Sequence, residues 1–182
     1  MRARDIPNLL CVLRIVMTVP VGWAIIEGRY PLAMGLFFIA GVTDGLDGFL
    51  AKRFSWQSRL GGLLDPAADK LLLATAFVTL WMAGHVPGWL LAAVVIRDLV
   101  IVTGAGLYHW RVQRLDAEPS TASKLNSFLQ LLYILSTLSL LVFGLPPSGP
   151  IAVLGWLVLL TTTYSGIDYV VRWAARARAA DA

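Results

Sequence analysis

The sequence predicts an all-α integral membrane protein with six transmembrane helices in one bundle. Of its 182 residues, 58% are hydrophobic and only 14% are charged. A soluble domain has roughly 25% charged residues, so this composition favours a bilayer as the surrounding medium. Six apolar stretches, each near the length that a membrane span needs, alternate with turn and charge signals. We therefore expect a single membrane domain over residues 1–182.

Glycine, proline and charged residues mark the boundaries of the expected spans. In order, the spans are expected at Pro7–Ile26, Pro31–Leu50, Leu63–Ala83, Pro87–Tyr108, Ser123–Phe143 and Pro150–Val171. Charged breaks are expected at Lys52–Gly62 and at Trp110–Ser120. Because the number of spans is even, both termini are expected on the same side of the membrane.

The distribution of basic residues predicts which side this is. The opposite loops hold only Arg29, whereas the side of the termini holds Arg2, Arg4, Lys52, Arg53, Arg59, Arg111, Arg114, Arg172, Arg176 and Arg178. The positive-inside rule then places the termini in the cytoplasm. The net charge of +4 indicates topology and contact with anionic lipid, and we expect no nucleic-acid partner. The expected location is a bacterial inner (plasma) membrane, and no cleavable signal is expected because the first apolar stretch is too long.

Two expected spans carry arginine. Arg14 lies about two turns inside the first span, where it needs an acidic partner or a water-filled cavity. An acidic cluster in the next two spans is the expected partner, and snorkelling to the surface is the alternative. In the fourth span, Arg97 and Asp98 are adjacent positions that do not face each other on a helix, so each is expected to find its partner elsewhere. Arg97 is a candidate anion-binding residue. The polar stretch Ser120–Asn126 suits a lipid headgroup, or is an ordinary capped helix start.

Four aspartates give the acidic cluster its chemistry. Asp44 and Asp47 are spaced i, i+3, and Asp65 and Asp69 are spaced i, i+4, so each pair shares a helix face. Each charge deep in a membrane helix costs roughly 2.5–3.5 kcal/mol, and two carboxylates about 5 Å apart repel by roughly 3 kcal/mol at an effective dielectric constant of 20. Bound Mg²⁺ or Mn²⁺ would neutralise these acids, and carboxylate oxygens are suitable ligands. The alternative is an interfacial loop held by salt bridges.

A metal site at the cytoplasmic face favours phosphoryl-group transfer, in which bound cations neutralise developing charge. Gly48 and Ala51 share the face of the first aspartate pair and leave room for a ligand. Asp69 is the candidate general base for an incoming hydroxyl. A divalent-metal transporter is the alternative from another class, although its site would be expected near the bilayer midplane.

The complete motif carries a resemblance to a known family. It comprises Asp44-x-x-Asp47-Gly48-x-x-Ala51-Lys52, eight further residues, and Gly61-x-x-x-Asp65-x-x-x-Asp69. This string resembles the signature of the CDP-alcohol phosphatidyltransferase family. The family usually has arginine where this chain has Lys52. Arg53 follows directly, so either residue is a candidate for contact with the diphosphate.

The resemblance implies a six-helix membrane enzyme in which an acceptor hydroxyl displaces CMP from a CDP-linked lipid or alcohol. The stretches Ile6–Leu9, Arg14-Ile15 and Leu64–Lys70 resemble the branch that makes phosphatidylglycerophosphate or cardiolipin. Arg97-Asp98-Leu-Val and Ser123–Asn126 are more similar to eukaryotic-type, CDP-diacylglycerol-dependent cardiolipin synthases.

The resemblance also implies a role for individual residues. It makes Asp44, Asp47, Asp65 and Asp69 the ligands of a centre of two Mg²⁺ or Mn²⁺ ions, with Asp69 also acting as base. It places around the CDP group Asn8, Gly48, Ala51, Lys52, Arg53 and Gly61. It assigns the acceptor phosphate to Arg97 and Lys124, with Arg14, Asp98 and Asn126 in support.

The implied donor is CDP-diacylglycerol and the implied acceptor is phosphatidylglycerol, whose terminal glycerol hydroxyl attacks the β-phosphate to give cardiolipin and CMP. Glycerol 3-phosphate is the alternative acceptor, as in phosphatidylglycerophosphate synthases. The family also implies a homodimer.

Overall fold

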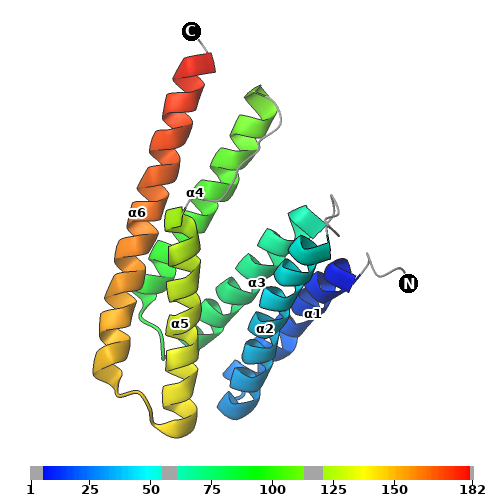
Figure 1. Ribbon diagram of the computed structural model, residues 1–182. Helices are drawn as coiled ribbons and strands as arrows, with labels where there is room; N and C mark the ends of the chain where they lie inside the picture. The colour runs from blue at the N-terminus through cyan, green and yellow to red at the C-terminus, as the bar shows by residue number, and fades with distance from the viewer. Residues whose placement is uncertain (1–5, 55–60, 113–120, 181–182) are drawn as a thin grey trace. The chain divides into compact units, whose positions relative to one another are not determined.

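The computed structural model describes residues 6–54, 61–112 and 121–180, and all of them outside the connecting turns are helical (Figure 1). Side chains are described for residues 9, 11–43, 68–104 and 121–172. In chain order the helices are α1 Ile6–Ile26, α2 Tyr30–Phe54, α3 Gly61–Met82, α4 Gly88–Val112, α5 Thr121–Phe143 and α6 Ser148–Ala180. The predicted all-α class and its six helices are therefore confirmed for the described part of the chain.

Three helices extend further than the sequence predicts. Helix α2 continues to Phe54, α4 to Val112 and α6 to Ala180, so the expected breaks at Lys52 and Trp110 begin too early. Hydropathy marks the hydrocarbon core of a bilayer, whereas a helix continues through the headgroup region, where water solvates its charged side chains. The length of an apolar stretch thus indicates a span, and it underestimates the length of the helix that contains it.

Helices α1 and α3 end in the same way, at a glycine with positive φ. Gly28 has φ +69° and Gly84 has φ +79°, a conformation that costs glycine little. After α3, the amide of His85 donates to the carbonyl of Leu80 and that of Gly84 donates to Trp81, both at 2.9 Å. These paired hydrogen bonds form a Schellman cap, which satisfies the last carbonyls and reverses the chain.

The helices form two compact units. The first comprises Met1–Val86 with Ile134–Pro147, and the second comprises Pro87–Tyr133 with Ser148–Ala182. In the first unit α1 packs against both α2 and α3, and in the second α4 packs against α6.

A glycine sets the distance between α1 and α3. A Cβ atom at Gly22 would lie 2.9 Å from Cγ2 of Thr75 and 3.3 Å from Cγ2 of Thr79, so only glycine allows this approach. The hydroxyl of Thr79 donates to the carbonyl of Thr75 at 2.7 Å, which satisfies it within α3. Small residues at such a crossing are typical of helices that associate in lipid, where close packing replaces the hydrophobic effect.

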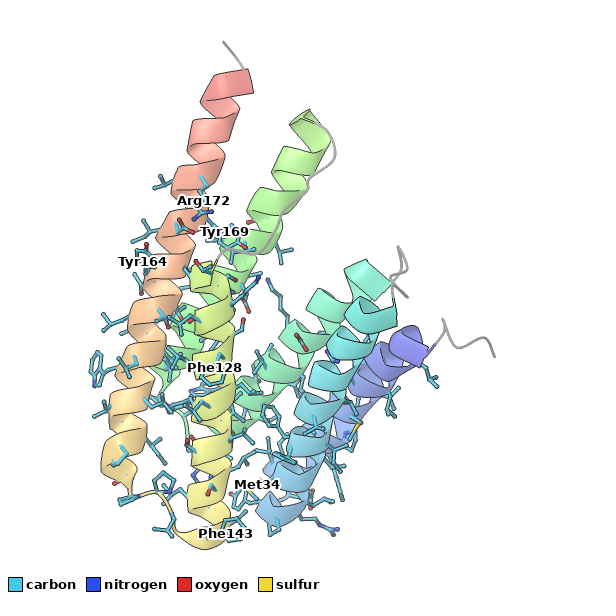
Figure 2. The ribbon with its side chains drawn as sticks, in the orientation of Figure 1. Met34, Phe128, Phe143, Tyr164, Tyr169 and Arg172 are labelled. Atoms are coloured by element: carbon cyan, nitrogen blue, oxygen red, sulfur yellow. The ribbon has the colours of Figure 1, made fainter. Side chains whose placement is uncertain are left out.

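The described interior is mainly apolar but also contains charged and polar side chains, while many large apolar side chains are exposed. The buried charged and polar residues include Arg14, Arg97, Asn126, Gln130 and Ser165. Large apolar side chains stand exposed on the helices, as do aromatic ones such as Tyr164 on α6 (Figure 2). A bilayer selects this arrangement, because lipid solvates apolar groups while polar groups find partners inside. Among the described residues, two segments are long and apolar enough to cross a membrane: Thr121–Phe143 and Ser148–Arg172.

Candidate functional site

The acidic motif lies on two helices of the first unit. Asp44 and Asp47 belong to α2, and Asp65 and Asp69 belong to the beginning of α3. Figure 1 shows the end of α2 and the beginnings of α1 and α3 at the same end of this unit. Helical backbone at all four positions gives each aspartate pair the shared face that its spacing predicts.

Asp69 is the member of this motif whose side chain the structure describes. The remaining predicted metal and CDP residues lie outside the described side chains: Asn8, Asp44, Asp47, Gly48, Ala51, Lys52, Arg53, Gly61 and Asp65. Among the side chains that are described, no three acidic, histidine or cysteine residues form a cluster able to hold a metal ion. The assigned ligands and the contact between Lys52 or Arg53 and a diphosphate therefore stay predictions.

Arg14 of α1 meets this motif directly. Its Nη1 donates to Oδ1 of Asp69 at 2.5 Å, across 55 positions of sequence. The arginine side chain is completely buried, whereas that of Asp69 remains 45% exposed. The prediction that the acidic cluster supplies the partner of Arg14 is confirmed, and the alternative of snorkelling to the surface is wrong. The hydrogen bond from the Thr18 hydroxyl to the Arg14 carbonyl, at 3.0 Å, lies one turn further along α1.

The glycine crossing between α1 and α3 lies in register with this ion pair. Gly22 lies eight positions after Arg14 on α1, and Thr75 and Thr79 lie six and ten positions after Asp69 on α3. Two helices that rise equally per residue and run in the same direction keep such offsets. The contact at Gly22 is therefore in register with the contact between the guanidinium and the carboxylate.

The donor set of the motif fits a hard divalent cation. Four carboxylates offer oxygen ligands, which Mg²⁺ and Mn²⁺ prefer over nitrogen or sulfur. Asp69 keeps nearly half of its side-chain surface exposed while it is paired with Arg14. This exposure allows Asp69 to contact a second partner in addition to the guanidinium.

A second buried arginine organises the other unit. Arg97 on α4 is 5% exposed, and its Nη2 donates to Oγ of Ser123 at 2.7 Å and to Oγ of Ser165 at 2.9 Å. These serines belong to α5 and α6, so one guanidinium joins three helices. Its Nη1 donates to Oδ1 of Asp98 at 2.6 Å. The prediction that Arg97 and Asp98 do not meet is wrong. Spacing rules describe the directions of Cβ atoms, and the long arginine side chain turns back to reach its neighbour.

The two other residues assigned to the acceptor region differ in placement. Lys124 is exposed and directly follows Ser123, which contacts Arg97. Asn126 is completely buried, and its Oδ1 accepts hydrogen bonds from Thr161 at 3.0 Å and Thr162 at 2.8 Å. Asn126 thus links α5 to α6 through hydrogen bonds, and its supporting role in an acceptor site stays a prediction.

Sequence reasoning missed Ser165, which is fully buried beside Arg97. It also missed Asp168, whose Oδ1 accepts a hydrogen bond from Nε of Arg172 at 2.8 Å. The available signal was the spacing of Ser165 and Asp168 at i, i+3 within an apolar stretch, which puts both on one helix face. Figure 2 shows Arg172 towards the C-terminal part of α6.

The first unit thus carries an acidic motif on two helices, and each unit contains a buried arginine. Comparison with known families is more specific. The model of the CDP-alcohol phosphatidyltransferase family matches residues 4–166. This chain therefore belongs to the CDP-alcohol phosphatidyltransferase family.

Several curated proteins are similar over most of the chain. A probable CMP-forming cardiolipin synthase of Drosophila melanogaster is 33% identical over 91% of this chain and 56% of its own length. The CMP-forming cardiolipin synthase of Homo sapiens is 32% identical over 90% of this chain and 60% of its own length. A probable phosphatidylglycerophosphate synthase of Mycobacterium tuberculosis is 32% identical over 94% of this chain and 82% of its own length. The chain thus spans less than two thirds of the length of the two cardiolipin synthases.

Proposed function

We propose that this protein acts in phospholipid biosynthesis and transfers a phosphatidyl group from CDP-diacylglycerol to phosphatidylglycerol, with cardiolipin and CMP as products. The observation that supports the reaction class is the family match over residues 4–166. The choice of acceptor rests on similarity to CMP-forming cardiolipin synthases, which are 33% and 32% identical to this chain.

In the proposed reaction, Asp69 accepts the proton of the terminal glycerol hydroxyl of phosphatidylglycerol. The hydroxyl oxygen then forms a bond to the β-phosphorus of CDP-diacylglycerol. The bond between that phosphorus and the oxygen bridging to the α-phosphorus breaks, and CMP leaves with the bridging oxygen and its electron pair. Arg14 supports this role by orienting Asp69 through the 2.5 Å contact.

The acidic motif supplies the proposed metal centre, with Asp44, Asp47, Asp65 and Asp69 as ligands. A bound pair of Mg²⁺ or Mn²⁺ ions would neutralise negative charge on the diphosphate and on the departing CMP. Around the nucleotide we propose Asn8, Gly48, Ala51, Lys52, Arg53 and Gly61. This part of the proposal rests on the family signature and the helical backbone at these positions.

Arg97 is the proposed binding residue for the acceptor phosphate. A buried guanidinium is expensive in apolar surroundings, which favours an anionic partner in addition to Asp98. Ser123 and Ser165 hold it in place, and the exposed Lys124 adds positive charge after Ser123. Hydroxyl groups rotate at little cost, so both serines are able to reorient when a phosphate binds.

The second candidate acceptor is glycerol 3-phosphate. It is favoured by the 32% identity to a probable phosphatidylglycerophosphate synthase that this chain covers over 82% of its length. The same site would bind its phosphate at Arg97. Family membership favours either enzyme over a metal transporter, because CDP-alcohol transfer is the activity that gives the family its name.

The deciding experiment supplies purified protein with CDP-diacylglycerol and one acceptor at a time. We expect phosphatidylglycerol to give cardiolipin with an equal molar amount of CMP, measured by mass spectrometry and nucleotide analysis. Formation of phosphatidylglycerophosphate alone, from glycerol 3-phosphate, would identify the second candidate as correct. Metal flux into proteoliposomes without release of CMP would contradict both.

We also propose a six-span arrangement in the inner membrane, with the acidic motif facing the cytoplasm, and a homodimer. The bias of basic residues supports the orientation. Cysteine labelling from either side of oriented vesicles tests it, since a cysteine introduced near Arg29 should react only from the outside. The mass of the purified protein, measured by light scattering with the detergent contribution subtracted, tests the dimer.

A further inference from the structure

A groove of about 360 Å³ runs between α4 and α6 of the second unit. The α4 wall includes Ala93, Ile96 and Val100, and the α6 wall includes Gly166 and Val170. Ile96 and Val170 are 60% and 50% exposed, so the groove is open at the outer surface of this helix pair. Its volume falls within the range of about 300–1,000 Å³ that is typical of small-molecule sites.

Arg97 adds a charged residue to the otherwise apolar lining of this groove. The residue contributes to the groove lining although it is only 5% exposed. Its two terminal nitrogens have the partners described above, whereas its Nε is buried and has no hydrogen-bond partner among the described residues. A buried donor without a partner costs free energy, and an anionic ligand would remove this cost. A phosphate oxygen that reached Nε would satisfy this donor beside an otherwise apolar groove.

The rest of the lining offers little for a polar ligand to bind. Thr162 donates its hydroxyl to Asn126 at 2.8 Å, and Thr163 donates its hydroxyl to the Leu159 carbonyl at 2.9 Å. These threonines, both of which line the groove, have their hydroxyls engaged within the protein. A hydrocarbon ligand is therefore the kind that suits this lining.

Gly166 keeps the groove open next to the arginine. A Cβ atom there would lie 3.7 Å from Cγ of Arg97, which is ordinary van der Waals contact and requires no movement. A larger side chain would extend into the groove. Glycine in the interior of a helix costs roughly 0.5–1 kcal/mol of stability relative to alanine. The space that Gly166 leaves in the groove accounts for a glycine at this position.

We propose that this groove binds an acyl chain of the acceptor phosphatidylglycerol while Arg97 binds the phosphate of the same molecule. This inference rests on the proposed function and adds a basis for acceptor choice. Glycerol 3-phosphate has a phosphate and no chain, so the groove would contribute to the binding of the lipid acceptor alone.

The test compares phosphatidylglycerol with its deacylated form, glycerophosphoglycerol, in the full-length protein with CDP-diacylglycerol as donor. The variants Gly166→Leu and Ala93→Leu fill the groove from opposite walls. Gly149→Leu is the matched control, because it lies on α6 and a Cβ atom there meets nothing within 4 Å. We expect the KM for phosphatidylglycerol to rise about 10-fold in both groove variants, since exclusion of two methylene groups has an effect of about this size. The KM for glycerophosphoglycerol and for CDP-diacylglycerol should stay unchanged.

Labelling of the wild-type protein gives a readout that does not depend on the folding of a variant. Phosphatidylglycerol with a photoreactive diazirine in one acyl chain should label peptides that include residues 162–171, and excess unlabelled phosphatidylglycerol should prevent the labelling. If unlabelled lipid does not reduce the labelling, the label reports only non-specific contact with bulk lipid, and the proposal is overturned.

Two kinetic results would also overturn it. A rise in the KM for CDP-diacylglycerol with both acceptors would assign the groove to the donor, and unchanged constants in both groove variants would assign it no role. Failure of the proposed function is seen separately, in the wild-type protein, as transfer to glycerol 3-phosphate without transfer to phosphatidylglycerol.

Discussion

Arg14 in the first unit and Arg97 in the second are both buried, yet their surroundings differ. Arg14 reaches an aspartate on another helix, at 2.5 Å, and that aspartate belongs to the acidic motif. Arg97 pairs at 2.6 Å with the aspartate next to it in sequence and adds two serine hydroxyls from other helices. One arginine is thus part of a long-range ion pair, and the other is part of a local pair surrounded by neutral groups.

This difference indicates different tasks. The partner of Arg14 lies on α3, which packs against α1, so Arg14 is suited to orient Asp69. Arg97 pairs with the neighbouring Asp98, and its other partners are neutral serine hydroxyls, which are able to rotate. An anion that binds Arg97 would replace serine contacts between helices of the second unit and would leave the Arg14–Asp69 pair unchanged. The predictions below act on one arginine region and leave the other as an internal control.

Removal of divalent metal should have the largest effect and should act through the acidic motif alone. We expect chelation to reduce turnover by a factor of about 10³ or more, because charge on the diphosphate would lose its stabilisation. Addition of Mg²⁺ or Mn²⁺ should restore activity. Calorimetric titration of the metal-free protein should show weaker Mn²⁺ binding in Asp44→Asn and unchanged binding in Arg97→Gln. Full activity after thorough chelation would contradict the metal assignment.

Asp69→Asn should reduce turnover by about 10²–10⁴-fold, the usual contribution of a general base. It should also destabilise the protein by about 1–3 kcal/mol, because Arg14 loses a charged partner while remaining buried. This loss of stability is smaller than that expected for a fully buried ion pair, since the Asp69 side chain is 45% exposed.

Asp44→Asn provides the comparison for this stability effect. It should lose a similar factor in turnover and keep the stability of the wild-type protein, since it removes one of several mutually repelling acids. Denaturation of both variants in the same detergent would measure the difference. Equal stability of the two variants would mean that the Arg14 contact contributes little.

The sequence was sufficient to predict much of this molecule. Apolar length and turn residues predicted all six described helices, and a charge inside a span predicted that Arg14 needs an acid. It was insufficient where a side chain decides the outcome. The Arg97–Asp98 pair depends on how a flexible arginine folds back, and the role of Ser165 depends on which face of α6 meets α4. Neither follows from spacing along one helix.

Arg97→Gln should act on the acceptor and leave the donor unaffected. We expect the KM for the acceptor to rise about 10–100-fold, as is reasonable for loss of a charged hydrogen-bonding group worth about 1.5–3 kcal/mol. The KM for CDP-diacylglycerol should stay within about 2-fold of the wild-type value, within the error of such comparisons. Arg97→Lys should restore only part of the binding, because lysine keeps the charge and cannot donate to both serines and Asp98 in the same geometry.

Steady-state kinetics with one substrate varied at a time would check this separation of the two regions. Equal increases in both KM values would show that Arg97 supports the whole site instead of the acceptor. A normal acceptor KM would remove Arg97 from the binding site.

Gly22→Leu should have the smallest effect on turnover, about 10-fold, and it tests whether packing alone determines the Arg14–Asp69 contact. Its Cβ atom would lie 2.9 Å from Cγ2 of Thr75, so α1 must move away from α3. Overpacking of this kind typically costs about 1–3 kcal/mol, and displacement by 1 Å is enough to reduce catalysis markedly.

Gly35→Leu is the control, because a Cβ atom at Gly35 on α2 meets nothing within 4 Å. The acceptor KM should stay unchanged in both variants, since neither residue lies in the unit that contains Arg97. Wild-type turnover and stability in Gly22→Leu would show that the ion pair holds its own register and does not depend on the glycine crossing.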